Sequence, residues 1–314
     1  MEANLKNRLK IKAIIVASFI LPLFATWVCA SFGTSGWQIF TMVQSAQFSG
    51  ISSAAPAEGD ITGSLYNPAV LGTFKDRELS FTSEQGLDSD VLGSVMYGEP
   101  LHNGMIAAGF AYYDAGTAEL NWLDNNGALN TQNVSAEKDT MGFVSFQHMA
   151  TKTLSWGITL KGASSILAER QEAYACAVDA GVLILLSPNL SLSLAAQNIG
   201  SSTKFIAVAN PLPTAGYAGC GYIFRFGSVY ILSTIGVTYF INDVTTVPEA
   251  GVEFGSGAVS LNAGYSGYDG EANTEMGIKL KLKSFVVGYA FLPSTNLNSV
   301  QRLSISYRFK TNPH

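Results

Sequence analysis

Few residues of this chain could support acid–base or nucleophilic catalysis. The three histidines are His102, His148 and His314, and a Ser-His-Asp triad would need His102 from a tight turn or His148 from the end of an expected strand. Such a triad would make the protein a lipase or a protease, which is the enzyme alternative. We expect instead a protein that is not an enzyme and has no catalytic residues.

Metal-binding side chains are also sparse. Cys176 and Cys220 each lie in an apolar, strand-like segment with no close histidine partner, which favours buried or lipid-facing thiols over a disulfide framework or a zinc site. Asp269-Gly270-Glu271 could bind calcium weakly, but turn chemistry explains these residues more simply. We therefore expect no metal and no cofactor.

The composition indicates a surface that water does not cover completely. Charged residues make up 13% of the chain, about half the level usual in soluble domains. The formal net charge is only -5, so there is no basic field for nucleic acid. A nucleic-acid partner is not expected.

Residues 1–30 read as a signal peptide. Basic residues from Lys6 to Lys12 precede an apolar run at 13–28, and Val28-Cys29-Ala30 is close to the small-x-small pattern of a cleavage site. A retained N-terminal membrane anchor is the alternative. After Ala30 no stretch of about 20 apolar residues remains, which excludes a helical membrane protein on hydropathy.

Residues 31–73 differ from the rest of the chain, because small residues dominate and no strand alternation persists. Trp37, Ile39, Phe40 and Leu65 favour burial over a disordered leader. We expect a compact N-terminal hatch, or plug, in which Asn67-Pro68-Ala69 forms a turn that starts a helix.

Strand alternation begins at Arg77 and continues to the end of the chain. Met276, Ile278, Leu280 and Leu282 alternate with Gly277, Lys279, Lys281 and Lys283, a pattern of one apolar and one polar face. Lysines at alternate positions suit a wet lumen while the apolar face meets lipid. In the last such stretch, Leu303, Ile305, Tyr307 and Phe309 form the apolar face.

The links between strands provide an independent test of a membrane barrel. We expect about 14 strands, at 77–84, 91–98, 105–113, 140–149, 153–162, 173–186, 189–198, 215–225, 229–241, 249–254, 258–267, 274–283, 285–291 and 301–309. Long and short links alternate, starting and ending with a long one, as in bacterial outer-membrane barrels with both termini on the periplasmic side. The expected fold is all-β: a roughly 14-stranded antiparallel transmembrane β-barrel over residues 74–314, with the hatch in its lumen, in the bacterial outer membrane.

The candidate functional residues follow from this arrangement. Tyr66, Asn67, Pro68 and Ala69 could gate a path through the lumen, or could simply fix the hatch to the wall. Asn198 and Glu253, near expected strand ends, could cap loops or contact a ligand, and Lys279 and Lys281 would form a positive lumen stripe, more often a solvated wall than a selectivity device. The final strand, 303–309, should close the barrel against the strand near Leu79 and Phe81, and Phe309 should present a signal to the barrel assembly machinery.

Several segments together resemble the PorV/PorQ family of outer-membrane barrels, part of the wider FadL-like group. They are Gly33-Thr34-Ser35-Gly36, Ala46-Gln47-Phe48-Ser49-Gly50, the acidic pair Glu58 and Asp60, Tyr66-Asn67-Pro68-Ala69, Ala196-Gln197-Asn198-Ile199-Gly200, Pro211-Leu212-Pro213, Gly251-Val252-Glu253-Phe254, Ala263-Gly264-Tyr265, Gly288-Tyr289-Ala290 and 302–309. The chain departs from the family at Gln47 and Asn262, where arginine is usual, and at Ser52 and Ser53, where glycines are usual.

Two functions follow, besides a purely structural barrel. The resemblance implies a non-enzymatic barrel that binds cargo or partner proteins of a type IX-like secretion system, with outer-membrane lipid around it. The alternative is a FadL-like channel for uptake of hydrophobic small molecules. A channel needs an apolar pocket between hatch and strands, whereas a cargo-binding barrel should expose an apolar patch on its loops.

Overall fold

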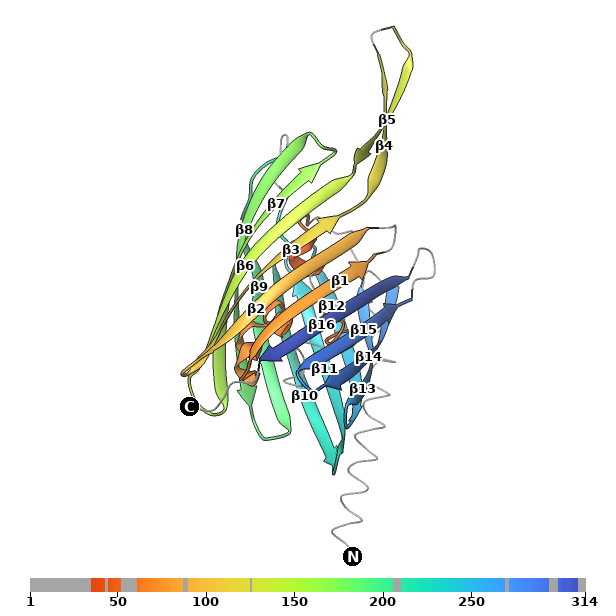
Figure 1. Cartoon of the computed structure of the whole chain (residues 1–314). Helices are drawn as coiled ribbons and strands as arrows, with labels where there is room; N and C mark the ends of the chain where they lie inside the picture. Colours follow the sequence, from red (N-terminus) through yellow and green to blue (C-terminus); the bar gives the residue numbers. More distant parts are fainter. Residues whose placement is uncertain are drawn as a thin grey trace, which may run out of the picture.

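A computed structural model of the chain describes residues 35–42, 45–51, 61–86, 90–124, 126–205, 210–268, 271–293 and 299–309. They form a closed antiparallel barrel of fourteen strands (Figure 1). The expected signal peptide at 1–30 and the acidic pair Glu58 and Asp60 lie outside the described residues. The barrel confirms the fold class expected from the alternation and from the order of long and short links.

The strands follow one another around the barrel, except that β4 and β5 leave it as a separate pair. Their bounds are β1 Arg77–Gln85, β2 Val91–Leu101, β3 Gly104–Asp114, β4 Thr117–Leu123, β5 Leu129–Ser135, β6 Glu137–Met149, β7 Leu154–Leu167, β8 Gln171–Leu185, β9 Leu190–Ser202, β10 Ala215–Phe226, β11 Val229–Phe240, β12 Thr245–Ser256, β13 Val259–Tyr268, β14 Glu271–Leu282, β15 Phe285–Leu292 and β16 Val300–Phe309.

The sequence analysis expected no strand between 113 and 140, and the structure corrects this. Most of this segment is the hairpin β4–β5, which projects from one end of the barrel (Figure 1). β4 is exposed along almost its whole length, and in β5 only Val134 and Ser135, at the base of the hairpin, are buried. Alternation is a weak signal for such a hairpin, because no face has to be apolar. We call this end of the barrel the loop end and the opposite end, with the short links, the turn end.

The last strand closes the barrel on the first. In β16, Tyr307 lies opposite Leu79 and Ile305 lies opposite Phe81 of β1. The side chains of Leu303, Ile305 and Phe309 are exposed on the outer face, whereas Ser304 and Ser306 are buried toward the lumen. A period of two therefore separates an apolar outer face from a polar inner one.

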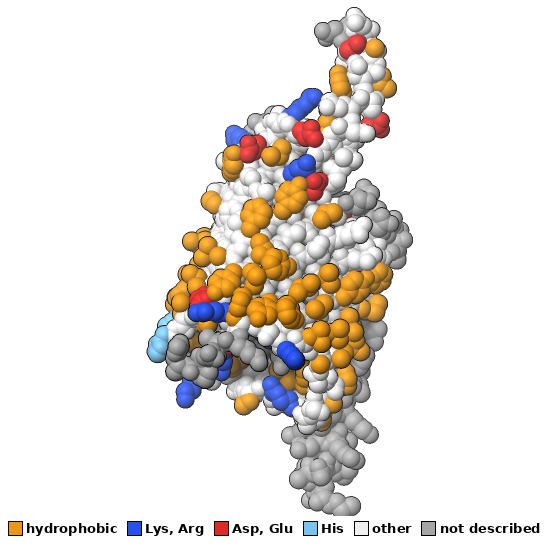
Figure 2. Space-filling model, viewed as in Figure 1, with side chains coloured by type: hydrophobic (Ala, Val, Ile, Leu, Met, Phe, Trp, Pro, Cys, Tyr) orange, Lys and Arg blue, Asp and Glu red, His pale blue; other side chains and the backbone are white. Residues whose placement is uncertain are grey.

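The outer surface carries the apolar side chains that the alternation placed there. Hydrophobic side chains cover much of the face in Figure 2, and most charged side chains lie toward the two ends. The exposed residues include Leu160, Leu194, Leu261, Leu282 and Phe285, as expected of strands that face lipid. None of the described helices is long and apolar enough to cross a membrane.

The described parts of residues 35–73, called the hatch from here on, lie inside the barrel. Their elements are α2 Ile39–Met42, η2 Ile61–Leu65 and η3 Pro68–Thr73. Residue 35 is bound near the loop end, since Ser35 N donates to Asp243 Oδ1 at 2.8 Å. η3 lies toward the turn end, where Ser155 Oγ donates to Ala69 O at 2.9 Å. The chain thus descends the lumen before β1 begins.

Glycines let the hatch backbone touch the barrel wall. A Cβ on Gly264 of β13 would lie 2.1 Å from the carbonyl oxygen of Gly50, and one on Gly251 of β12 would lie 2.0 Å from the same atom. Gly50 itself has φ +73°, a conformation that glycine adopts without steric cost. The turn at 45–51 is therefore held against β12 and β13 by backbone contact.

A methyl group at this contact should displace the turn and leave the barrel intact. We expect Gly264→Ala to expose Phe48 to chymotrypsin in the folded protein, because the new Cβ would overlap backbone atoms of Gly50. Gly216→Ala is the control, since a Cβ on Gly216 has no atom within 4 Å. Heat-modifiable gel mobility reports barrel folding for both variants. Equal protease resistance in the two would contradict the packing.

Candidate functional site

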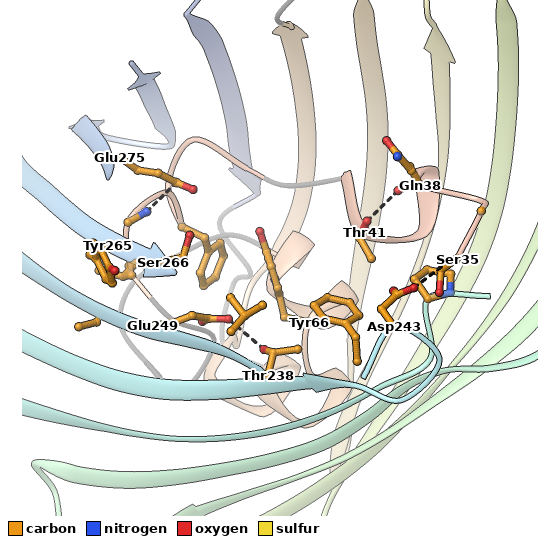
Figure 3. Close-up of a pocket in the computed structure, with 18 residues that line it drawn as sticks. Ser35, Gln38, Thr41, Tyr66, Thr238, Asp243, Glu249, Tyr265, Ser266 and Glu275 are labelled. Atoms are coloured by element: carbon orange, nitrogen blue, oxygen red, sulfur yellow. Dashed lines mark hydrogen bonds between the residues drawn. The ribbon is translucent and has the colours of Figure 1, made fainter. Parts of the chain in front are cut away.

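A cavity of about 570 Å³ lies between the hatch and the loop-end halves of β11 to β14 (Figure 3). The hatch contributes residues from 35–41, the turn at 48–51, and Tyr66, and the wall contributes residues from β11, β12, β13 and β14. This volume is within the range of small-molecule sites. The cavity is the candidate functional site.

Three carboxylates line the cavity, each bonded to a neighbour. Asp243 accepts a hydrogen bond from Ser35 N at 2.8 Å. Glu275 Oε2 accepts one from Gly50 N at 2.9 Å, and Glu249 accepts one from Thr238 Oγ1 at 2.9 Å. Figure 3 shows these bonds on the cavity wall. Two of the three carboxylates therefore bind the hatch backbone as well as bordering open space.

Aromatic rings provide the apolar part of the lining. Phe48 and Tyr66 of the hatch and Phe240 of the wall line the cavity, and the centroids of Phe48 and Tyr66 are 6.2 Å apart. Burial raises the pKa of Tyr66 well above its usual value, so the phenol stays neutral and protonated. The cavity thus combines rings with acidic groups.

The motif Tyr66-Asn67-Pro68-Ala69 is divided between two places. Tyr66 borders the cavity, whereas Asn67 caps η3 by accepting a hydrogen bond from Ala69 N at 2.9 Å. The amide nitrogen of Asn67 donates to Ser193 Oγ at 2.7 Å and to the carbonyl oxygens of Val182 and Leu194 at 3.2 and 3.3 Å. Asn67 therefore fixes the hatch to β8 and β9.

The Asn67-Pro68 turn packs against two further glycines of the barrel wall. A Cβ on Gly157 of β7 would lie 2.6 Å from the carbonyl carbon of Pro68, and one on Gly181 of β8 would lie 1.9 Å from Asn67 Oδ1. The turn thus fits against a depression in the inner wall that only glycines leave open.

Asn198 belongs to a buried network and not to the cavity. It was expected at the end of a strand, but β9 continues to Ser202, and Asn198 has φ +55°, which asparagine tolerates. It accepts a hydrogen bond from Lys161 Nζ at 2.9 Å, and its N–H donates to Asp179 Oδ1 at 2.7 Å. Lys161 and Asp179 form a fully buried ion pair of 2.6 Å, beside a register shift between β8 and β9.

Glu253 and Lys279 also lie outside the cavity lining. They form a buried ion pair of 3.0 Å, and Tyr230 donates a hydrogen bond to Glu253. The expected solvated positive stripe is therefore wrong for Lys279, because Glu253 neutralises it away from water. Lys281 is partly exposed on the same strand and does not line the cavity.

The sequence analysis did not name Glu249 and Glu275, although the strand alternation already indicates that both side chains point inward. Glu249 shares the inward phase of Glu253, and Glu275 shares that of Gly277 and Lys279. The alternation could have placed both in the lumen. Their position around one cavity depends on where the hatch packs, which alternation does not report.

The histidines do not assemble a triad in the part of the chain that the structure describes. His102 is in the exposed link between β2 and β3, and the ring of His148 lies 5.8 Å from that of Trp156. Within the described ranges, no cluster of three or more His, Cys, Asp or Glu side chains is placed to hold a metal ion. Cys176 is exposed and Cys220 is half-buried.

An apolar groove of about 460 Å³ on the strands β8 to β13 lies against the wall that bounds the cavity. Glu249, Ala250 and Tyr265 line both spaces. Pairing between β12 and β13 ends at Glu249 and Ser266, and the next residue of β12 is Pro248, which has no N–H to donate. The two strands are therefore paired at the shared residues, and the pairing stops directly beyond them, toward the loop end; we call this place the seam.

The fold matches solved structures of outer-membrane channels. The Pseudomonas putida toluene transporter TodX superposes with a TM-score of 0.61 and 13% identity, over 84% of this chain and 97% of that one. The Ralstonia pickettii toluene transporter TbuX gives 0.61 and 12%, over 85% and 98%. A Pseudomonas aeruginosa FadL homologue gives 0.54 and 9%, over 85% and 98%.

These matches establish the fold, which is that of the FadL- and TodX-type fourteen-stranded barrels. No sequence-family model and no curated protein sequence matches the chain. The fold that the resemblance to the FadL-like group implies is therefore confirmed, while the relation to PorV and PorQ stays a prediction.

Removing the side-chain amide of Asn67 should weaken the attachment of the hatch to the wall. We expect Asn67→Ala to reduce local stability by about 2 kcal/mol, since it removes an N-cap and buried hydrogen bonds to the wall. Hydrogen exchange of amides in 61–73 should then accelerate by about 30-fold, as that free energy implies. Asn103→Ala, in the exposed link between β2 and β3, is the matched control. Unchanged exchange in Asn67→Ala would show that the hatch is held elsewhere.

Proposed function

We propose that this protein is a bacterial outer-membrane channel that takes up hydrophobic small molecules, with residues 31–73 as its hatch. The observation that carries the proposal is the cavity between hatch and wall, in which Phe48, Ile51 and Phe240 provide an apolar surface beside the carboxylates. A channel of this kind needs a binding space beside its plug. The fold it shares with TodX and TbuX, which are described as toluene transporters, supports the same function. The apolar outer surface supports a location in lipid.

The seam between β12 and β13 offers a route out of the cavity. A compound bound beside Tyr66 lies next to Glu249, Ala250 and Tyr265, the three residues shared with the outer groove. A hydrophobic compound would gain free energy by moving from the lumen to the apolar groove. The second route leads toward the turn end past the hatch, where Asn67 and η3 would have to move.

Filling the cavity should block uptake. We expect cells that lack their own hydrophobic-compound channels to accumulate labelled toluene severalfold faster when they express this protein. Ser266→Trp, which places an indole in the cavity from β13, should return the rate to that of cells with an empty vector. Ala263→Trp is the control on the same strand, because Ala263 is exposed on the outer face. Full uptake by a folded Ser266→Trp protein would contradict the proposal.

Binding of a secretion partner is the second candidate function, and one observation favours it. The tip of the β4–β5 hairpin exposes Trp122, Leu123 and Leu129, the last two with about two thirds of their surface accessible (67% and 68%). Apolar side chains on an exposed loop suit a protein-binding surface. Asp124 accepts hydrogen bonds from the backbone amides of Ala128 and Asn126, and these bonds lower its pKa.

Deleting the hairpin separates the two functions. The bonds Ala115 N to Glu137 O at 3.0 Å and Ala136 N to Gly116 O at 2.9 Å bring its two ends together, so a short glycine link can replace 117–135. For the uptake channel we expect this variant to fold and to retain toluene uptake. Loss of co-purifying secretion components or cargo from the native envelope, with uptake absent in both proteins, would favour the second function.

A further inference from the structure

The cavity has a charge pattern that uptake of a neutral hydrocarbon does not require. Its described lining includes the carboxylates of Asp243, Glu249 and Glu275 and no lysine, arginine or histidine. Arg302 lies near enough to act on Glu275 and Tyr66. Its guanidinium, however, donates to Glu84 Oε2 at 2.5 Å and to Ser49 Oγ at 2.7 Å. Carboxylates therefore dominate the cavity.

Glu249 and Glu275 have hydrogen-bonding capacity left for a ligand. Each uses one oxygen at 2.9 Å, Glu249 with Thr238 Oγ1 and Glu275 with Gly50 N. Among the described residues, no hydrogen bond reaches the second oxygen of either carboxylate. Figure 3 shows both carboxylates on the side of the cavity that holds Tyr265 and Ser266.

Aromatic rings beside these carboxylates complete the site. Phe48 and Tyr66 lie with centroids 6.2 Å apart and their planes tilted by 44°, and both line the cavity with Ile51. Ring faces attract cations and also accept hydrocarbon. A space with paired carboxylates and ring faces fits a molecule that is cationic at one end and apolar at the other.

We propose that the cavity selects hydrophobic molecules that carry a protonated amine. The ammonium group bonds the second oxygens of Glu249 and Glu275, and the hydrocarbon packs on Phe48, Tyr66 and Ile51. A molecule with a carboxylate at the same position meets like charges in a poorly solvated space, which is unfavourable. The inference rests on the proposed channel function and adds its substrate class.

Three probes of similar shape and different charge test the proposal on the purified full-length protein in detergent. They are 2-phenylethylamine, which is protonated at neutral pH, 2-phenylethanol and 3-phenylpropionate. Calorimetric titration should give the amine an affinity about tenfold higher than that of the alcohol, as expected for a partly desolvated ion pair. The carboxylate should bind more weakly than the alcohol. Equal affinities for the amine and the carboxylate would overturn the proposal.

Isosteric variants identify the residues responsible. Glu249→Gln with Glu275→Gln should lower the affinity for the amine to that of the alcohol and leave the alcohol unaffected, because glutamine retains the shape and one acceptor. Glu172→Gln, on the exposed surface of β8, is the control. Heat-modifiable mobility verifies that each variant folds. An amine preference that survives in the double variant would overturn the assignment.

The remaining outcomes separate this inference from the channel itself. Equal binding of the amine and the alcohol, with toluene uptake intact, overturns the charge preference and keeps the channel. Absence of binding by all three probes, together with no uptake, overturns both. Calcium that displaces the amine and binds through Glu249 and Glu275 would assign the carboxylates to a metal ion and overturn the substrate class.

Discussion

Backbone contact between the hatch and the wall at glycine positions is the constraint on which the arrangement of the lumen depends. Gly50 packs against Gly251 and Gly264 on one side of the lumen. The Asn67-Pro68 turn packs against Gly157 and Gly181 on the other. Any side chain at these positions would hold the hatch away from the wall, because the contacts leave no space for a Cβ. With both sides fixed, the remaining space lies in front of β11 to β14 and becomes the cavity.

The charges in the lumen fall into two groups with different roles. Lys161 with Asp179, Lys279 with Glu253, and Arg302 with Glu84 are buried pairs at 2.6, 3.0 and 2.5 Å. In each pair the attraction between the two charges offsets the cost of removing both of them from water. Glu249 and Glu275 differ, since they accept hydrogen bonds from a hydroxyl and from a backbone amide. Neither forms a salt bridge in the described part of the chain, and each keeps one oxygen available to a ligand, which is why we assign these carboxylates, and not the buried pairs, to a ligand.

The cavity and the outer groove lie on opposite sides of the same strands. Pro248 ends the hydrogen bonding between β12 and β13, and the cavity and the outer groove share three residues there. A local loss of pairing at the rim costs little because the rest of both strands remains paired. The same strands therefore hold the hatch, shape the cavity and bring it close to the apolar outer surface.

The sequence alone determined the barrel, because a period of two forces the inner and outer faces apart and the alternating link lengths fix the direction of every strand. It also placed Asn67-Pro68 at the start of a helix-like turn, since proline lacks the N–H that a first turn leaves unused. It could not show that Asn198 and Glu253 are committed to buried networks, or that β4–β5 is a hairpin with no core to specify it. The meeting of Tyr66, Glu249 and Glu275 was decided only by the tertiary structure. These three residues meet because glycine contacts bring together segments that lie far apart in the chain. Local periodicity carries no information about such contacts.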